Sequence, residues 1–412
     1  MEIGVEEGAK FRFEAPANIK PVVAYGTSIC QGACASRPAM AWTNILQRRL
    51  GHEVVNMGFS GNAFMENEVI DLLAEIDAKI YILDAMPNIC GFKEPEAIRD
   101  TVLNAVRRLR AARPQTPILI ADHAGYSNSL ANPDAKRKQN NALEMQKAAY
   151  QILVEEGVKG LYYLSYDEIG MHQDVTVEGV HMSDYGMVTY ADAYEKKLRE
   201  ILYEPVGDIR TMVPVVQQRD PYNWMDRHYD IVTESAGQHY SRVLIGDSIM
   251  HFWSDTDDAS SVNGQAVWDK FDGASLNMGC GYDRIENVLW RIYHGQIDNF
   301  TADRIFLTIG TNNLGSCTDE EIVEGIAHLL SVIKFRRPEA EVTLMGIFPR
   351  RDREDRIKNL NRLLKKTAKT AGVGFDDPGQ VFLKKGKIDE SLFLDGLHPN
   401  EAGYELIAPY YN

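Results

Sequence analysis

The sequence lacks three features that mark other classes of protein. No stretch approaches the roughly 18 apolar residues of a membrane span, so none is expected. Basic residues form only short clusters and the net charge is −15, which argues against a nucleic-acid surface because phosphate binding needs a concentrated basic face. The five cysteines are odd in number and form no CxxC pair, so they signal neither a disulfide framework nor a zinc motif. We expect most of them to be buried, and no metal or cofactor to be needed.

The N-terminus shows no targeting segment. Residues 1–4 have neither the basic region nor the apolar core of a signal peptide. Residues 2–14 alternate as a strand does, so residues 1–20 are expected to form an N-terminal arm. One interpretation is that this arm ends a β domain missing from the chain. The compartment stays open, and a longer protein could be periplasmic or secreted. The oligomeric state stays open too.

Strand-length apolar runs alternate with helical segments throughout the 412 residues. In the first half, strands are expected at 21–25, 54–56, 80–83, 118–121 and 161–164, and helices at 42–50, 66–76, 97–112, 134–156 and 185–202. In the second half, strands are expected at 243–245, 275–277, 305–309 and 342–347, and helices at 285–293, 319–335 and 353–371. This alternation predicts an α/β fold whose parallel sheets carry helices on both faces.

The length suits two domains of about 150 to 200 residues each. Between the two α/β patterns the chain becomes polar and turn-like, with a helix expected over residues 223–235. We therefore expect a boundary near residue 215. The domains are placed at 21–205 and 241–412, with 206–240 as a linker and connecting helix.

A chemical pattern occurs once in each half. An apolar run ends in Gly26-Thr27-Ser28 and another in Gly246-Asp247-Ser248, and each is followed by Asn-Met-Gly. Each half closes with Gly-x-His, so that His181 lies 153 residues after Ser28 and His398 lies 150 residues after Ser248. Two serines with histidines at nearly the same interval suggest two related hydrolase domains.

Ser248 is placed where a nucleophile could act. It follows a strand at the edge where open α/β sheets collect their ligands. A structural alternative is that it only caps a helix, which serine favours. Asn312 follows a predicted strand and His398 lies near the C-terminus, so both can converge on the same cleft. Asp395, three residues before His398, could orient that imidazole as a general base.

These motifs resemble the SGNH or GDSL hydrolase superfamily. The second half is most similar to the catalytic subunits of platelet-activating-factor acetylhydrolase, through residues 277–291 and 310–313. The resemblance implies two tandem three-layer αβα domains of flavodoxin-like type. It implies that Ser248 is the nucleophile, Asn312 an oxyanion donor, His398 the base and Asp395 its partner. One position departs from the family, because Tyr282 stands where a glycine donates its backbone N–H; Gly281 is the fallback.

The first half resembles a GDSL-like family of bacterial esterases. That likeness assigns Ser28 as nucleophile, His181 as base and Gly61 as oxyanion residue. Asn88 and Glu178 would stand in for the missing family residues at altered positions. Asp174 or a backbone carbonyl could orient His181 instead of Glu178.

The function expected is that of a serine esterase acting on small acyl esters, foremost acetyl groups on carbohydrates. One alternative is a phospholipid acetylhydrolase. Another is a catalytic second domain joined to a first domain that only binds substrate. A third, disfavoured, is a non-enzymatic scaffold of two decayed hydrolases. Four further residues favour structural roles, namely Asp84, His123, Trp253 and Trp290.

Overall fold

The computed structural model describes residues 4–6, 8–9, 19–92, 94–218, 222–254 and 259–412. The chain divides into two compact units, one of Lys20–Pro205 and one that contains Val206–Asn412. Most of the N-terminal arm expected over residues 1–20 lies outside the described residues. Within the described ranges, none of the helices combines the length and the apolar character needed to cross a bilayer.

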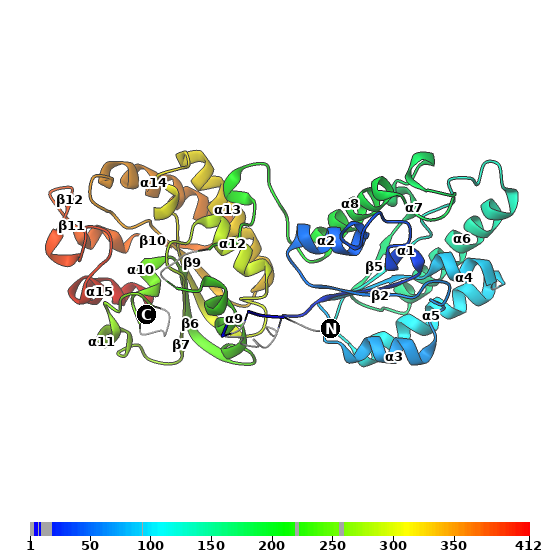
Figure 1. The fold of residues 1–412 in the computed structure, drawn as a ribbon. Helices are drawn as coiled ribbons and strands as arrows, with labels where there is room; N and C mark the ends of the chain where they lie inside the picture. The colour runs from blue at the N-terminus through cyan, green and yellow to red at the C-terminus, as the bar shows by residue number, and fades with distance from the viewer. Residues whose placement is uncertain (1–3, 7, 10–18, 93, 219–221, 255–258) are drawn as a thin grey trace. The chain divides into compact units, whose positions relative to one another are not determined.

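The first unit is built on a parallel five-stranded sheet, at the right of Figure 1. In spatial order its strands are Val54–Gly58 (β2), Val22–Gly26 (β1), Ile80–Asp84 (β3), Ile118–Ala121 (β4) and Leu161–Leu164 (β5). Each expected strand is confirmed to within two residues of its bounds. All neighbouring strands pair in parallel, as the α/β prediction requires.

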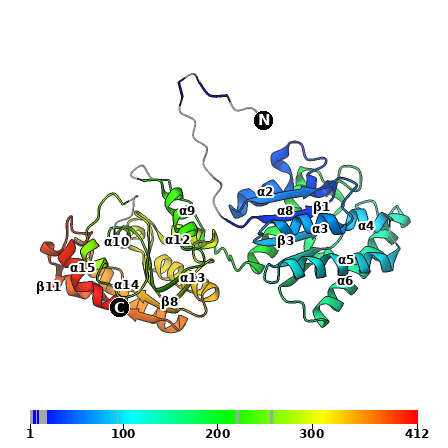
Figure 2. The same cartoon turned by 90° about the horizontal axis from the view of Figure 1, so that it is seen from below.

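Helices cover both faces of this sheet (Figures 1 and 2). Alternate residues of a strand point to opposite faces, so Val22 and Ala24 join one core and Val23 and Tyr25 the other. The first core packs against Trp42–Leu50 (α2) and Asp184–Ile201 (α8). The second packs against Asn67–Glu75 (α3), Pro95–Ala112 (α5) and Pro133–Glu155 (α6). The helix Met86–Phe92 (α4) was not predicted from the sequence.

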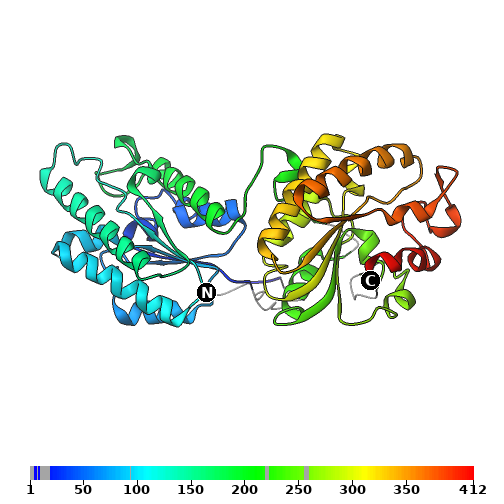
Figure 3. The same ribbon diagram turned by 180° about the vertical axis from the view of Figure 1, so that it is seen from behind.

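The second unit repeats the architecture. In spatial order its strands are Gly374–Asp376 (β10), Glu341–Met345 (β9), Thr301–Thr308 (β8), His239–Gly246 (β6) and Ser275–Gly279 (β7). Figures 1 and 3 show helices on both faces, among them Ile285–Tyr293 (α12), Asp319–Arg336 (α13), Glu354–Ala371 (α14) and Glu401–Ile407 (α15). Strand β10, helix α15 and a small hairpin of Leu383–Lys384 (β11) and Lys387–Ile388 (β12) were not among the expected elements.

The segment expected as a linker packs onto the second unit. Thr211 donates its hydroxyl to the Glu321 carbonyl at 2.6 Å. The connecting helix is Trp224–Glu234 (α9), and its Arg227 guanidinium donates to the Gly279 carbonyl at 2.7 Å. Thr211 is thereby tied to α13 and helix α9 to the end of β7, so both belong to the scaffold of the second unit.

Both sheets have the same winding. Numbered within its own unit, each follows the order 2-1-3-4-5. The direction of winding reverses between the first and third strands, and in open α/β sheets ligands bind outside the carboxyl ends at such a switch point. The loops after β1 and β6 begin there, and those loops carry Ser28 and Ser248.

Candidate active site

The two serines are the first residues of short helices, Ser28–Gln31 (α1) and Ser248–His251 (α10). They do not cap those helices. The cap of α1 is Thr27, whose hydroxyl accepts the Ile29 N–H at 3.2 Å. The cap of α10 is Asp247, whose carboxylate accepts the Ile249 N–H at 3.0 Å. Since another residue performs the capping, the structural alternative does not explain either serine.

In the second unit, a chain of hydrogen bonds joins Ser248 to a carboxylate. Ser248 Oγ lies 2.9 Å from His398 Nε2, and His398 Nδ1 lies 2.7 Å from Asp395 Oδ2. A carboxylate can only accept, which places the ring proton on Nδ1 and lets Nε2 accept from the serine. Asp395 also accepts the backbone N–H groups of Leu397 and His398, at 2.9 and 2.8 Å. Desolvation opposes these bonds, but together they outweigh it and lower the pKa of Asp395.

The first unit has the same chain of contacts. Ser28 Oγ lies 2.8 Å from His181 Nε2, and His181 Nδ1 is hydrogen-bonded to Glu178. Glu178 folds back to accept the backbone N–H groups of Val180 and His181, at 3.0 and 2.9 Å. These bonds outweigh desolvation and lower the pKa of Glu178. Asp174, the alternative partner, is 90% exposed and lies 3.9 Å from His172 instead.

An asparagine braces the loop behind each serine, a role that the sequence analysis did not assign. Asn56 donates to the Cys30 carbonyl at 2.7 Å, and Asn277 donates to the Met250 carbonyl at 2.9 Å. The amide oxygen of each accepts the N–H of the glycine two residues later, at 2.9 Å in both units. The repeated Asn-Met-Gly motif was the sequence signal that could have revealed this role. Its two copies make the same bracing contacts.

Gly61 and Tyr282 hold the same backbone conformation. Their φ angles are 70° and 65°, in the left-handed region that disfavours side chains. Tyr282 therefore adopts the φ angle that the glycine has in the first unit. The N–H of Gly281, the fallback donor, already points to His251 Nδ1 at 3.1 Å. Burial lowers the pKa of His251 to about 3, so its ring stays neutral and can accept that bond.

Asn88 and Asn312 occupy equivalent positions, which corrects the expectation that Asn88 is displaced. In the strand registers, Gly26 pairs with Asp84, and Gly246 pairs with Thr308. Each asparagine lies four residues after that partner.

Each of these asparagines also touches the loop of Gly61 or Tyr282. Asn312 donates one amide hydrogen to the Asp283 carbonyl at 2.9 Å, which leaves its second hydrogen for a ligand. We orient the Asn88 side-chain amide so that both its oxygen and its nitrogen are satisfied. Its oxygen then accepts the N–H groups of Asn62 and Ala63 at 3.1 and 2.9 Å. The nitrogen of Asn88 is then turned away from those donors.

One model of the GDSL-like lipase/acylhydrolase family matches residues 19–199, and a second model of the same description matches residues 244–406. The chain belongs to the GDSL-like lipase/acylhydrolase family. It is similar to platelet-activating factor acetylhydrolase IB subunit alpha1 of Bos taurus, with 27% identity over 200 residues, covering 46% of this chain and 82% of that protein. Subunit alpha2 of Homo sapiens is 29% identical over 192 residues, covering 45% of this chain and 80% of that protein.

Among solved structures, a GDSL-like lipase from Bacteroides ovatus is 36% identical, with a TM-score of 0.43. The match covers 46% of this chain and 55% of that structure, so this chain spans about half the length of that protein. The two family models together make the chain a tandem acylhydrolase, with one such domain in each half.

A buried ion pair supports the Tyr282 loop of this acylhydrolase. Asp283 lies 2.8 Å from Arg291, and its other oxygen accepts the Trp224 indole N–H at 2.8 Å. Burial raises the pKa of Asp283 to about 6 against the opposing attraction of Arg291. The arginine also donates a hydrogen bond to the Met278 carbonyl at 3.1 Å, which ties the loop to the end of β7.

A pocket of about 260 Å³ opens at Ser248. Its lining includes Phe252, Tyr282, Asn312, Leu397 and His398. Ligand sites for drug-sized molecules commonly span about 300 to 1,000 Å³, so this pocket is small. Tyr282 forms part of its wall and remains 48% exposed.

The four residues expected to be structural are buried or partly buried in the acylhydrolase. Tyr190 donates to Asp84 at 2.9 Å, and burial raises the pKa of Asp84 to about 8. His123 accepts the Gly125 N–H at 2.8 Å, and burial lowers its pKa to about 4. Trp253 packs on Tyr404 and Tyr411, and Trp290 stacks on His294. Four of the five cysteines are buried, whereas Cys34 is exposed.

Proposed function

We propose that both domains are serine esterases that act through an acyl-enzyme. The observation that carries the proposal is the duplicated chain Ser–His–carboxylate, with Oγ to Nε2 distances of 2.8 and 2.9 Å. A hydroxyl in hydrogen-bond reach of a base, with the base oriented by a third group, is the geometry of an activated nucleophile. The intact contacts of the first domain favour catalysis there over a purely binding role.

The reaction moves one proton back and forth through the histidine. As Ser248 Oγ attacks the ester carbonyl, His398 Nε2 takes the hydroxyl proton and the carbonyl oxygen becomes an oxyanion. His398 then gives that proton to the leaving alcohol, and the acyl group remains on Ser248. His398 next takes a proton from water, whose oxygen attacks this ester, and returns that proton to Ser248 Oγ as the acid leaves. Asp395 stabilises the imidazolium while it carries the proton. Ser28, His181 and Glu178 are assigned the same roles.

The oxyanion needs donors in place before the reaction. In the second domain we assign the Asn312 amide and the backbone N–H of Tyr282. Asn312 keeps one amide hydrogen beyond its bond to Asp283, and both residues line the pocket at Ser248. In the first domain the corresponding groups are Asn88 and Gly61, matched by strand register and by φ.

The substrate is proposed to be an ester of a small acid, foremost acetate, on a carbohydrate or other small alcohol. The limited pocket and the Tyr282 ring in its wall support a short acyl group. The names of the acetylhydrolase relatives support acetyl as that group and keep a phospholipid alcohol as the second candidate.

Hydrolysis of a 4-nitrophenyl ester series tests this assignment. Acetate should be cleaved by wild-type protein and by each of the Ser28→Ala and Ser248→Ala variants, while decanoate should be cleaved poorly. A preference for the decanoate would contradict the small acyl pocket. Full activity in Ser28→Ala, together with none in Ser248→Ala on every ester, would reduce the first domain to a binding module.

A further inference from the structure

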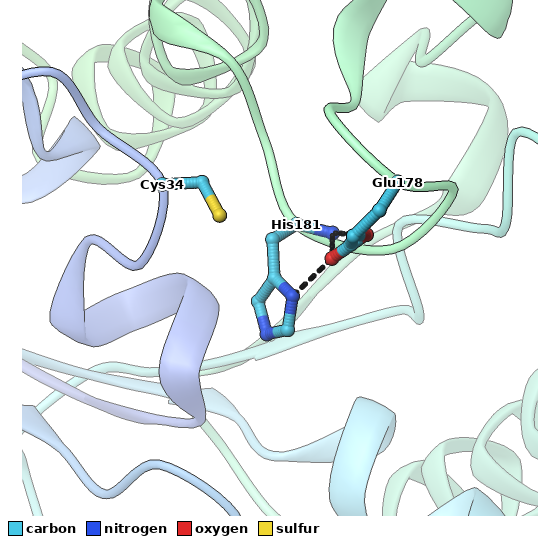
Figure 4. A group of neighbouring side chains, drawn as sticks. All are labelled: Cys34, Glu178 and His181. Atoms are coloured by element: carbon cyan, nitrogen blue, oxygen red, sulfur yellow. Dashed lines mark hydrogen bonds and ion pairs between the residues drawn. The ribbon is translucent and has the colours of Figure 1, made fainter.

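An exposed cysteine lies beside the proposed base of the first domain. Figure 4 shows the Cys34 thiol directed toward His181, with Glu178 on the far side of the imidazole. One ligand atom from each of these three side chains lies within 4.8 Å of the others. Among the residues that the structure describes, no other group of three metal-ligating side chains comes this close together.

The loop that carries Cys34 is held against the same site. The Ala33 N–H donates to the Ser28 carbonyl at 2.9 Å, which ties the loop to the nucleophile. Two residues beyond Cys34, the Ser36 N–H donates to Asp184 Oδ1 at 2.8 Å, at the first turn of α8. Because His181 lies three residues before Asp184, these two anchors keep the thiol near the imidazole.

Thiolate, imidazole and carboxylate together form a donor set that suits zinc. Zinc–ligand bonds of about 2.0 to 2.3 Å in a tetrahedron place ligand atoms about 3.3 to 3.8 Å apart. The ligand atoms already lie within 4.8 Å of one another, so the Cys34 thiol needs to approach by about 1 Å at most, while Glu178 turns away from its hydrogen bond with His181 Nδ1. The exposure of the Cys34 and Glu178 side chains allows both movements. A fourth position would remain for water.

We propose that zinc, or a similar thiophilic divalent cation, binds Cys34, Glu178 and His181 and switches off the first domain. This proposal rests on the assignment of His181 as base. On binding, the Cys34 thiol releases its proton to solvent. A metal on His181 Nδ1 forces the remaining ring proton onto Nε2, which can then no longer accept from Ser28. A metal on Nε2 occupies the acceptor atom itself.

The second domain is the internal control. Its pocket at Ser248 is lined by serine, asparagine, apolar and aromatic residues with Asp395 and His398, and no cysteine occurs among the lining residues described. Ser254, at the position that matches Cys34 in distance from the serine, is 4% exposed and engaged with Asn277. The cation should therefore leave Ser248 reactive.

Two readouts test the proposal on the full chain. The first is thiolate-to-metal charge-transfer absorption with Cd²⁺, compared between wild type and Cys34→Ser. The second is fluorophosphonate labelling under a Zn²⁺ titration, with Ser248→Ala reporting Ser28 and Ser28→Ala reporting Ser248. Loss of even an outer-shell partner weakens metal binding about 10- to 100-fold, so removal of the Cys34 ligand should raise the Zn²⁺ concentration for half-inhibition at least about tenfold.

The expected result is a Cd²⁺ band that Cys34→Ser abolishes, and Zn²⁺ protection of Ser28 but not of Ser248. Absence of the band in wild type, equal protection of both serines, or equal sensitivity of Cys34→Ser would overturn the proposal. The band reports binding alone. If Ser28 does not react with the fluorophosphonate even without Zn²⁺, that result counts against the proposed esterase activity of the first domain. The Cd²⁺ band still decides whether the metal site exists.

Discussion

Gly61 and Tyr282 share one backbone conformation, with φ of 70° and 65°, at equivalent points of two domains. One domain fills the position with the residue that the conformation favours, and the other with a ring that lines the pocket at Ser248. A side chain in this region carries a steric cost of roughly 1 to 2 kcal/mol. The second domain tolerates that cost in the wall of the pocket at Ser248.

Tyr282→Gly and Tyr282→Ala separate the backbone from the ring. Both variants remove the aromatic wall, so both should accept longer acyl chains than wild type. Only glycine relieves the conformation, so Tyr282→Gly should be more stable than Tyr282→Ala by about 1 kcal/mol. Chemical denaturation and the ester series measure the two effects. If both variants keep the wild-type chain-length preference, Tyr282 does not limit the acyl pocket.

Asp395→Asn and Glu178→Gln should each inactivate one domain. An amide cannot hold the imidazole tautomer or stabilise its cation, so kcat should fall by up to about 10⁴-fold in the affected domain. The measurement is turnover in the background of the other domain's serine-to-alanine variant. Asp174→Asn is the matched control for Glu178, since Asp174 lies toward His172 and should leave activity unchanged.

Asp84→Asn should stabilise the first domain at high pH. Burial raises the pKa of Asp84 to about 8, so the folded domain binds a proton that the unfolded chain releases near pH 4. Wild-type stability therefore falls as pH rises from about 4 to about 8 through this group, and the neutral asparagine removes that slope. Calorimetry should show a variant advantage that grows from about pH 5 to about pH 8. An advantage independent of pH would contradict a protonated Asp84.

The sequence predicted the parts of the fold that follow from local patterns. The strands of the first domain and helices such as α12 lie where their apolar periodicity placed them. Strand β10 has only three residues, and α15 seven, so neither is long enough to show a period.

Contacts between segments that lie far apart along the chain could not be predicted from the sequence. The Ser–His interval indicated which residues could meet, but the register that makes Asn88 equivalent to Asn312 depends on strand pairing. Cys34 gave no signal, because Glu178 and His181 approach it only after the sheet has formed.

The most direct test of two esterase sites is intact-protein mass spectrometry after reaction with a fluorophosphonate. Wild-type protein should gain two adducts, each single serine variant should gain one, and the Ser28→Ala/Ser248→Ala protein should gain none. Peptide mapping should place the adducts on Ser28 and Ser248. A single adduct on folded wild-type protein, or labelling that persists in the double variant, would contradict the account.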